Sequence, residues 1–424
     1  MIDNKKTKVL FLTTFDIDLP GHAFPLMNSL PKEEYETRLF VLSNKYGNTE
    51  YSLLGSGIIF GIYRRLLKVY QLLFVFLKYC IIPIVDKKHS EYCYYSNDFI
   101  PSYANIILRK LKDFKPDIIS IHWVSMFISS ATIRDLYKKT NAKIVYSFID
   151  QQHMMGGCHY AIDCEGFKKE CKNCPALIRG NLLSHYQLEN KKKNLKQVPV
   201  IISGNPCDVR IASEESSLFK SLSHKTLSVL SLSKDILFTP HQLAREKYSI
   251  EEGSFVVLLG CSSVLERRKG LVYALEALKL ANKRINKMVV LVVGKIKETE
   301  MSLFDDFKYI STGYLSLNDL FETFCASNCF LSPTIGDSGP MMVNFAVELG
   351  VPVISFKVGI AETVVLHKET GYIANYKNSN DLANGLEYIA NLSDEDYSEM
   401  CKKCRDIVPK LASSEPWYEQ VKKM

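Results

Sequence analysis

Three consecutive cationic side chains follow an apolar run in the second half of the chain, within the segment GCSSVLERRKGLVYALEAL. Arg267, Arg268 and Lys269 stand where this run gives way to a helical pattern that begins near Gly270. In an open α/β sheet, ligands bind outside the carboxyl ends of the strands. Because arginine can hold two phosphate oxygens at once and lysine supplies a compact charge, the segment predicts a diphosphate site. A solvated basic turn is the alternative interpretation.

A second segment, TIGDSGPMMVNFAVELGVPVISF, joins an acid, a glycine-proline turn and the start of a helix. Asp337 is placed to accept hydrogen bonds from sugar hydroxyls, and Gly339 lets the backbone approach a ligand closely. The amides of Met341 and Met342 at the helix start are placed to receive phosphate oxygens. Paired methionines pack in a core more often than they line a binding surface, so core packing is the alternative for these side chains.

The first half of the chain carries a weaker anion signal, where the run FLTTF leads into Gly21-His22 and a helical pattern from Ala23 to Leu30. A strand, a glycine turn and a helix start expose backbone N–H groups to an anion, so Gly21 is a candidate nucleotide contact. No GxGxxG motif is present, and an ordinary strand-to-helix turn is an equal alternative. His122 and Trp123, which end a later apolar run, are placed to hydrogen-bond or stack on a sugar, or simply to pack.

Four of the twelve cysteines lie close together in the segment GGCHYAIDCEGFKKECKNCP. They are Cys158, Cys164, Cys171 and Cys174. Four thiolates in a short span can close a tetrahedral zinc site that stabilises a loop with no core of its own. Free buried thiols are the main alternative, and redox chemistry is a weaker one. Because four sulfur ligands leave no open coordination position, we expect no catalytic metal at this site. We also expect no other cofactor for catalysis.

The elements that position these residues follow from an alternation of short β-branched apolar runs with helical periodicity, which predicts parallel sheets covered by helices. The expected strands of the first half are 9–13, 38–42, 117–122, 143–148, 200–203 and 227–232. Those of the second half are 255–260, 288–294, 309–313, 329–333, 352–356 and 371–374. We therefore expect two Rossmann-like domains. Their expected bounds are 1–232, with the cysteine-rich insert at 156–175, then 233–412, and a terminal helical segment at 413–424.

The overall composition fits a soluble globular protein of two domains. The chain has 424 residues, more than one hydrophobic core usually organises, with 47% apolar and 23% charged residues. A net charge of +7 spread along the chain fits anionic substrates or an anionic membrane surface and does not single out nucleic acid, which we leave out of the expected partners. The polar start runs straight into an apolar strand, unlike a secretory signal, so we expect a cytoplasmic protein or one at the inner face of the membrane.

The segment from Ile58 to Val85 stands apart because it mixes aromatic and aliphatic residues with several basic ones. Its longest uncharged run, from Val69 to Leu77, is too short to span a bilayer. Two interpretations remain. The segment is a helix packed on the first domain, or it is an amphipathic surface that makes peripheral contact with anionic lipid.

Together these motifs resemble the retaining glycosyltransferases of family 4, whose GT-B fold has two Rossmann-like domains facing each other across a cleft. The resemblance covers nearly the whole chain. It depends on the turn RRKG, the pair Gly313-Tyr314, the stretch LSPTIGDSGPMMVN and the strand entry GVPVI. The cysteine segment looks like an insert in bacterial members that build polysaccharides.

The resemblance implies a nucleotide diphosphate sugar held mainly by the second domain and a glycan or lipid-linked acceptor held mainly by the first. Arg268 and Lys269 would neutralise the diphosphate, Gly21 would approach it from the other domain, and Asp337 would contact the donor sugar. The implied reaction is hexosyl transfer with retention, in which the leaving diphosphate helps to take the acceptor proton. The terminal helix would return to the first domain, with Trp417 as its anchor.

Two positions depart from the family pattern. Where many relatives place a ribose-binding glutamate, this chain has Phe345 beside Asn344, and a phenyl ring cannot accept those hydrogen bonds. Where the family places a His-Asp pair, this chain has Ile149-Asp150, and the histidine is absent unless His153 substitutes. The expected substrate contacts at these family positions are Asp150, Gly313 and Asn344. The departures keep open two alternatives to transfer, a non-catalytic binding or scaffold homologue and a sugar-nucleotide epimerase.

Overall fold

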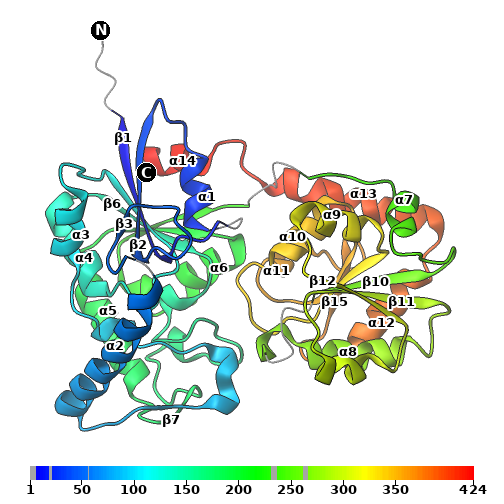
Figure 1. Cartoon of the computed structure of the whole chain (residues 1–424), viewed down its shortest axis with the longest axis horizontal. Helices are drawn as coiled ribbons and strands as arrows, with labels where there is room; N and C mark the ends of the chain where they lie inside the picture. The colour runs from blue at the N-terminus through cyan, green and yellow to red at the C-terminus, as the bar shows by residue number, and fades with distance from the viewer. Residues whose placement is uncertain (1–5, 19–21, 56, 231–235, 261–265) are drawn as a thin grey trace. The chain divides into compact units, whose positions relative to one another are not determined.

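The structure is a computed structural model of the chain that describes residues 6–18, 22–55, 57–230, 236–260 and 266–424, without the side chains of 57 and 58. It divides into two compact units (Figure 1). The first unit comprises Met1–Val229 together with Glu415–Met424, and the second comprises Leu230–Ser414.

The first unit is built on a seven-stranded sheet with the order β3-β2-β1-β5-β6-β8-β9, in which every neighbouring pair is parallel. Its strands are β1 (Thr7–Phe15), β2 (Tyr35–Ser43), β3 (Tyr51–Ser52), β5 (Ile118–Ile121), β6 (Lys143–Phe148), β8 (Val200–Gly204) and β9 (His224–Ser228). The chain builds outward from β1 to β3 on one side and from β5 to β9 on the other. The strand order therefore reverses between β1 and β5.

Helices cover both faces of this sheet, so successive side chains of its strands are buried in turn on each face. In β1, Leu10 and Leu12 enter the core beneath α3 to α5, whereas Val9 and Phe11 enter the core beneath α1 and α14. The helices of the unit are α1 (Ala23–Asn28), α2 (Gly57–Tyr79), α3 (Ala104–Leu111), α4 (Ser130–Thr140), α5 (Leu183–Leu195), α6 (Pro206–Arg210) and α14 (Trp417–Lys423).

The second unit is built on a six-stranded parallel sheet with the order β12-β11-β10-β13-β14-β15. Its strands are β10 (Phe255–Gly260), β11 (Met288–Val293), β12 (Tyr309–Gly313), β13 (Cys329–Ser332), β14 (Val353–Phe356) and β15 (Gly371–Ala374). Its helices are α7 (His241–Glu246), α8 (Leu271–Ala281), α9 (Leu317–Cys325), α10 (Met341–Glu348), α11 (Ala361–Val364), α12 (Ser379–Ala390) and α13 (Asp394–Leu411). Here the strand order reverses between β10 and β13.

The α/β architecture with two parallel sheets confirms the predicted fold class, and most expected strands lie within two residues of their observed bounds. Two expected strands differ by more. The strand expected at 38–42 begins three residues earlier, in β2, and the one expected at 227–232 is β9, which spans His224–Ser228, while residues 231 and 232 lie outside the described part of the chain. Because β9 begins with the polar residues HKT, a search for apolar runs does not find where this strand starts. A small antiparallel pair, β4 (Ile84–Val85) and β7 (Leu177–Arg179), is too short to show a period.

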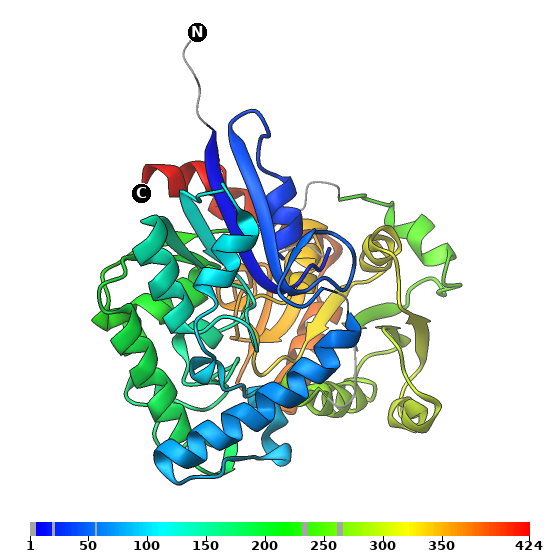
Figure 2. The same cartoon turned by 60° about the vertical axis from the view of Figure 1, so that its left-hand side comes forward.

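The segment from Ile58 to Val85 is mostly the single helix α2, which lies on the outside of the first unit (Figure 2). Within the described ranges, no helix is both long enough and apolar enough to span a membrane. The terminal helix α14 packs on the first unit, where Trp417 is 7% exposed and its Nε1 donates to Ser203 Oγ at 3.0 Å.

Candidate active site

The charged residues predicted in the second unit gather at the point where the order of its strands reverses. Arg268 and Lys269 lie in a short 3-10 turn (Arg267–Lys269) after β10, and Asp337 lies in the loop from β13 to α10. Since β10 and β13 are neighbours in the sheet, both segments leave it at the same edge. Such a reversal opens a crevice at the carboxyl ends of the strands, where α/β proteins bind ligands.

Both cations contact one oxygen of the same carboxylate. Arg268 Nη1 lies 2.8 Å and Lys269 Nζ 2.5 Å from Asp337 Oδ2, and Arg268 also pairs with Glu266. The side chain of Asp337 is 9% exposed, against 16% for Arg268 and 31% for Lys269. The cluster thus has a buried acid at its base and a lysine at its open side, which suits an anionic ligand arriving from solvent.

Electrostatics keep Asp337 ionised in this setting. Burial by itself raises the pKa of a carboxyl group, but the charges and hydrogen bonds of Lys269 and Arg268 outweigh it and hold the pKa of Asp337 below its ordinary value. A dianionic diphosphate placed near the open side would therefore meet two cations whose orientation is already set by a fixed acid.

Gly270 lets the basic turn lie directly against the end of β13. Its φ is +69°, and a Cβ at this position would stand 1.9 Å from the carbonyl oxygen of Pro333. The turn is further attached by the amide of Ile335, which donates to the carbonyl of Arg268 at 2.8 Å. Any larger residue at 270 would push the two cations away from Asp337.

The residues predicted at the start of α10 lie beside this cluster and differ in how far they are buried. Gly339 is exposed just before the helix, and Met341 is half-buried. Met342 packs at the end of β10, because a Cβ on Gly260 would stand 2.7 Å from its sulfur. Among described atoms, the buried Oδ1 of Asn344 has no hydrogen-bond partner, so it is available to a ligand.

Phe345 belongs to the core and not to the site. Its side chain is 5% exposed and packs edge-on against Phe321, with ring centroids 5.1 Å apart. The ring of Phe345 therefore contributes to core packing and offers no hydrogen bond to a ligand. Gly313 also lies apart from the cluster, at the end of the edge strand β12, which is separated from β10 by β11.

Sequence reasoning missed Gly359, which follows β14 and contacts the Asp337 loop. Its φ is +56°, and a Cβ there would stand 2.7 Å from the carbonyl oxygen of Asp337 and 2.6 Å from that of Ser338. The segment VGIAE in which it lies carries no motif, so only the tertiary contact reveals it.

In the first unit, His122 ends β5 next to the reversal point between β1 and β5. It is 1% exposed, its Nε2 lies 3.0 Å from Ser120 Oγ, and burial lowers its pKa to about 3. Within the described ranges, its Nδ1 has no hydrogen-bond partner. His122 is thus a neutral imidazole whose Nδ1 remains for a hydrogen bond with a ligand. Gly21, predicted to approach the nucleotide, lies outside the described residues.

Asp150 follows β6 and pairs with a histidine that the sequence did not suggest. His159 Nδ1 lies 2.6 Å from Asp150 Oδ2, and its Nε2 lies 2.8 Å from Ser125 Oγ. The indole Nε1 of Trp123 donates to the same Nδ1 at 3.1 Å, so this nitrogen of His159 lies between a donor and the Asp150 carboxylate. Burial raises the pKa of Asp150, but His159 outweighs it and keeps the pKa below its ordinary value. Position 149 is an isoleucine as the sequence shows, and the histidine that contacts Asp150 is His159 instead.

His153, the substitute considered from the sequence, does not take this part. Its ring packs against Tyr146 and Phe148, with centroids 4.8 Å and 5.3 Å apart, and it is 6% exposed. Burial lowers its pKa to about 4. His153 is a core residue, and the histidine of the pair comes from the cysteine-rich insert.

The four cysteines of the insert line one small cavity of about 20 Å³. The thiols of Cys158 and Cys174 share a hydrogen bond, which lowers the pKa of Cys174 to about 7. In the part of the chain that the structure describes, no three His, Cys, Asp or Glu side chains are arranged as a metal site. Zinc binding by these thiols stays a prediction, in which the sulfurs would have to move closer together.

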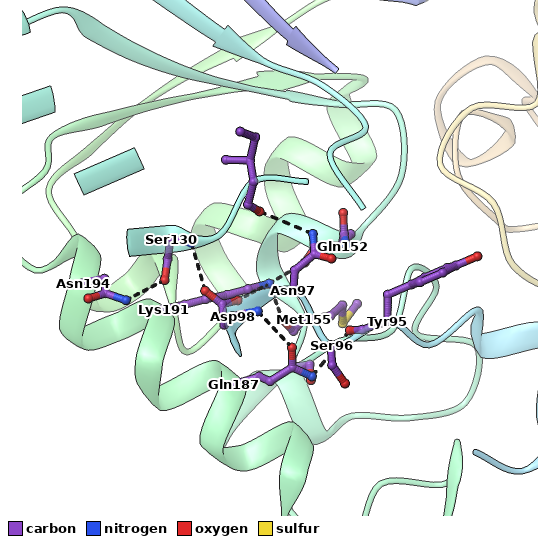
Figure 3. A network of polar contacts seen from close by, with 12 residues as sticks. Tyr95, Ser96, Asn97, Asp98, Ser130, Gln152, Met155, Gln187, Lys191 and Asn194 are labelled. Carbon is purple, nitrogen blue, oxygen red and sulfur yellow. Dashed lines mark hydrogen bonds and ion pairs between the residues drawn. The ribbon is translucent and has the colours of Figure 1, made fainter. Parts of the chain in front are cut away.

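A buried polar network attaches the insert to the rest of the first unit (Figure 3). Lys191 of α5 is 8% exposed and donates from Nζ to the carbonyl oxygens of Gln152 at 2.9 Å and Met155 at 2.7 Å. Its Nζ also lies 3.9 Å from Asp98 Oδ2, while Gln187 Nε2 donates to the carbonyl oxygen of Gly156 at 2.9 Å. The network fixes the backbone between Asp150 and His159, at Gln152, Met155 and Gly156.

Comparisons with known proteins agree with this arrangement. Residues 256–391, the core of the second unit, match the family model described as "Glycosyl transferases group 1". No match was found among curated protein sequences.

Several solved structures are similar over nearly the whole chain. Sucrose-phosphate synthase from Thermosynechococcus elongatus has a TM-score of 0.60 at 14% identity and covers 99% of this chain and 97% of its own. HepE from Anabaena, solved in complex with UDP-glucose, has a TM-score of 0.61 at 10% identity and covers 98% of both chains. WaaG, a glycosyltransferase involved in lipopolysaccharide biosynthesis, has a TM-score of 0.59 at 13% identity and covers 98% of both chains.

At these identities the structural likeness shows the fold, which is GT-B. The family match covers residues 256–391, within the unit that carries the Arg268, Lys269 and Asp337 cluster. This part of the chain is thus similar to group 1 glycosyl transferases, and the chain has a GT-B fold.

Proposed function

We propose that the protein transfers a hexosyl unit from a nucleotide diphosphate sugar to a glycan or lipid-linked acceptor, with retention at the anomeric carbon, in the synthesis of a cell-surface polysaccharide. One observation carries the proposal. Two cations held by Asp337 stand at the strand-order reversal of a unit similar to group 1 glycosyl transferases. The complex of HepE with UDP-glucose supports a uridine diphosphate sugar as the first donor to test.

In this proposal the protein acts mainly by stabilising charge that develops as the donor bond breaks. Arg268 and Lys269 neutralise the departing diphosphate, and the first amides of α10 offer further hydrogen bonds. Asp337 orients the two cations and accepts hydrogen bonds from the donor sugar. The diphosphate itself helps to remove the acceptor proton, so no separate base is needed.

The test is to measure transfer and nucleotide binding in Lys269→Ala beside the wild type and a control, Lys283→Ala, at an exposed lysine of the same unit. Loss of a preorganised charge lowers turnover by about 10²–10³-fold. We expect that loss in Lys269→Ala, unchanged melting temperature, and wild-type activity in the control. Wild-type turnover in Lys269→Ala would reject the site, and a product with inverted anomeric configuration by NMR would reject retention.

Phe345 favours a second candidate function, a non-catalytic binding component. It stands where the resembled family places a ribose-binding glutamate, and its ring is packed in the core. The two candidates differ in a simple assay. A binder would show a thermal shift with uridine diphosphate but no sugar transfer or donor consumption with any acceptor. Consumption of the donor alone, with conversion to another sugar nucleotide, would indicate an epimerase instead.

A further inference from the structure

Helix α2 turns an apolar stripe to solvent. Seven of its apolar side chains, spaced three, four or one residue apart, are between 48% and 79% exposed. They are Ile59, Ile62, Leu66, Val69, Leu73, Phe76 and Leu77. Residues at these spacings share one face of a helix. A helix on the surface of a globular protein normally presents polar residues there, so this face is unusual for a helix in contact with water.

The opposite side of α2 is the side that packs on the first unit. Leu67 and Val75 are buried there, at 7% and 1% exposure. Tyr63 OH donates to the carbonyl of Met126 at 2.9 Å, and Gln71 Nε2 donates to that of Ser96 at 2.6 Å. The orientation of the helix is therefore fixed by core packing and hydrogen bonds, and turning the apolar stripe inward would break these contacts.

The charged residues of α2 itself all have one sign. α2 contains no acidic residue, and Arg64, Arg65, Lys68 and Lys78 are all exposed. Across the described residues, no carboxylate forms an ion pair with Arg64, Arg65 or Lys68. The apolar surface continues beyond the helix in Ile82, Ile84 and Val85, which are 45% to 48% exposed. An apolar band with unpaired basic neighbours matches the boundary of an anionic bilayer.

We propose that α2 docks the first unit on an anionic lipid surface, lying in the plane of the interface with Leu66 and Leu73 in the acyl region and Arg65 among the headgroups. A second copy of this chain fits the surface less well. In a two-fold dimer the same patch would face itself and bring basic residues against basic residues. The proposal rests on α2 alone and does not depend on the proposed transferase activity.

The test is co-sedimentation of the full chain with vesicles of phosphatidylcholine alone and of phosphatidylcholine mixed with phosphatidylglycerol. We expect binding to the mixed vesicles only, weakened by salt. The double variant Leu66→Gln/Leu73→Gln should reduce binding at least about tenfold through lost apolar burial. Arg65→Gln/Lys68→Gln should reduce it and remove the preference for anionic lipid.

The matched control is Leu243→Gln/Val272→Gln, which replaces two side chains of the second unit that are 56% and 67% exposed. It should bind vesicles as the wild type does, and thermal melting should show that all three variants remain folded. Equal vesicle binding by wild type and Leu66→Gln/Leu73→Gln would overturn the proposal. So would a dimer in sedimentation velocity that this variant disperses. Uridine diphosphate binding, measured on the same samples, would separate this outcome from a failure of the proposed function.

Discussion

In both units an aspartate that follows a strand of the sheet holds basic partners, but the two are supported differently. Asp337 contacts Arg268 and Lys269, which lie partly open to solvent on a short turn. Asp150 contacts His159, both almost fully buried, and the loop that supplies the histidine is held by Lys191 and its network. The first arrangement needs one well-placed glycine, and the second needs an insert and a buried lysine.

This difference suggests different roles for the two aspartates: Asp337 belongs to a ligand-binding cluster, and Asp150 belongs to a structural one. Side chains that can move toward a ligand at little cost are found at the Asp337 cluster, where the lysine is 31% exposed. Side chains that must be fixed before any ligand arrives are found at the Asp150 pair. Replacing Lys269 or Arg268 should therefore change turnover more than stability, and replacing members of the Asp150 pair or the Lys191 network should do the reverse.

The largest expected effect is that of metal removal from the cysteine-rich insert. A structural zinc contributes on the order of 10 kcal/mol to a small domain, so chelation should lower the melting temperature of the first unit. Metal analysis should find about one zinc per chain, lost in Cys174→Ser and kept in Cys401→Ser, a cysteine of helix α13. If the protein contains no zinc and chelator does not change its melting temperature, zinc does not stabilise the insert, and the polar network alone holds it.

Replacing the buried lysine is the next largest change. Lys191→Met removes two hydrogen bonds to carbonyls and leaves the buried Asp98 carboxylate without its cation. Loss of one partner from a buried pair costs about 3–5 kcal/mol, which denaturant unfolding would measure. Lys193→Met, at an exposed position of the same helix, is the control and should be nearly neutral. Equal stability of the two variants would contradict the role given to the network.

Glycine 270 offers a test of the second unit. Gly270→Ala combines left-handed backbone with a Cβ placed 1.9 Å from the Pro333 carbonyl. Gly253→Ala has a similar φ, +73°, but no atom within 4 Å of the new Cβ. We expect a cost of about 1–3 kcal/mol from backbone strain in both, and a further loss in Gly270→Ala alone. Donor affinity should fall only in Gly270→Ala, because only that turn carries Arg268 and Lys269.

The smallest expected effect is that of Asp150→Asn, about 1–3 kcal/mol, because the amide keeps the shape but not the charge. The folded-state pKa of Asp150 is lowered, so its ionised form stabilises the fold above the ordinary carboxyl pKa of about 4. That contribution is lost as the pH falls through the folded-state pKa. Melting temperatures of wild type and variant should therefore differ at neutral pH and converge in acid. A constant difference would show that the carboxylate charge is not responsible.

The second-unit site could be predicted because each of its parts lies within a short motif beside an apolar strand. Arg268 and Lys269 precede a helix start, and Asp337 precedes another, so the topology of a parallel sheet brings them together. Their mutual contact at Asp337 was not predicted, because it depends on how closely Gly270 approaches β13.

The first-unit pair escaped prediction for a physical reason. His159 lies in a loop without periodicity, nine residues after Asp150, and its position is set by contacts that no local pattern encodes. Lys191 begins a run of three lysines, a pattern typical of a solvated helix face, yet it is buried. One signal was present. Leu188, Lys191 and Leu195 are spaced as one face of a helix, and the two leucines are 0% and 1% exposed.

The return of residues 415–424 to the first unit has a consequence for the order in which the protein assembles during synthesis. Trp417 packs near Phe11 of β1, with ring centroids 6.3 Å apart, and Val421 is fully buried on the same face. A ribosome makes this face of the sheet hundreds of residues before the helix that covers it. The second unit can thus fold while the first still exposes an uncovered apolar surface, and the two units are completed in the reverse of the order in which their synthesis begins.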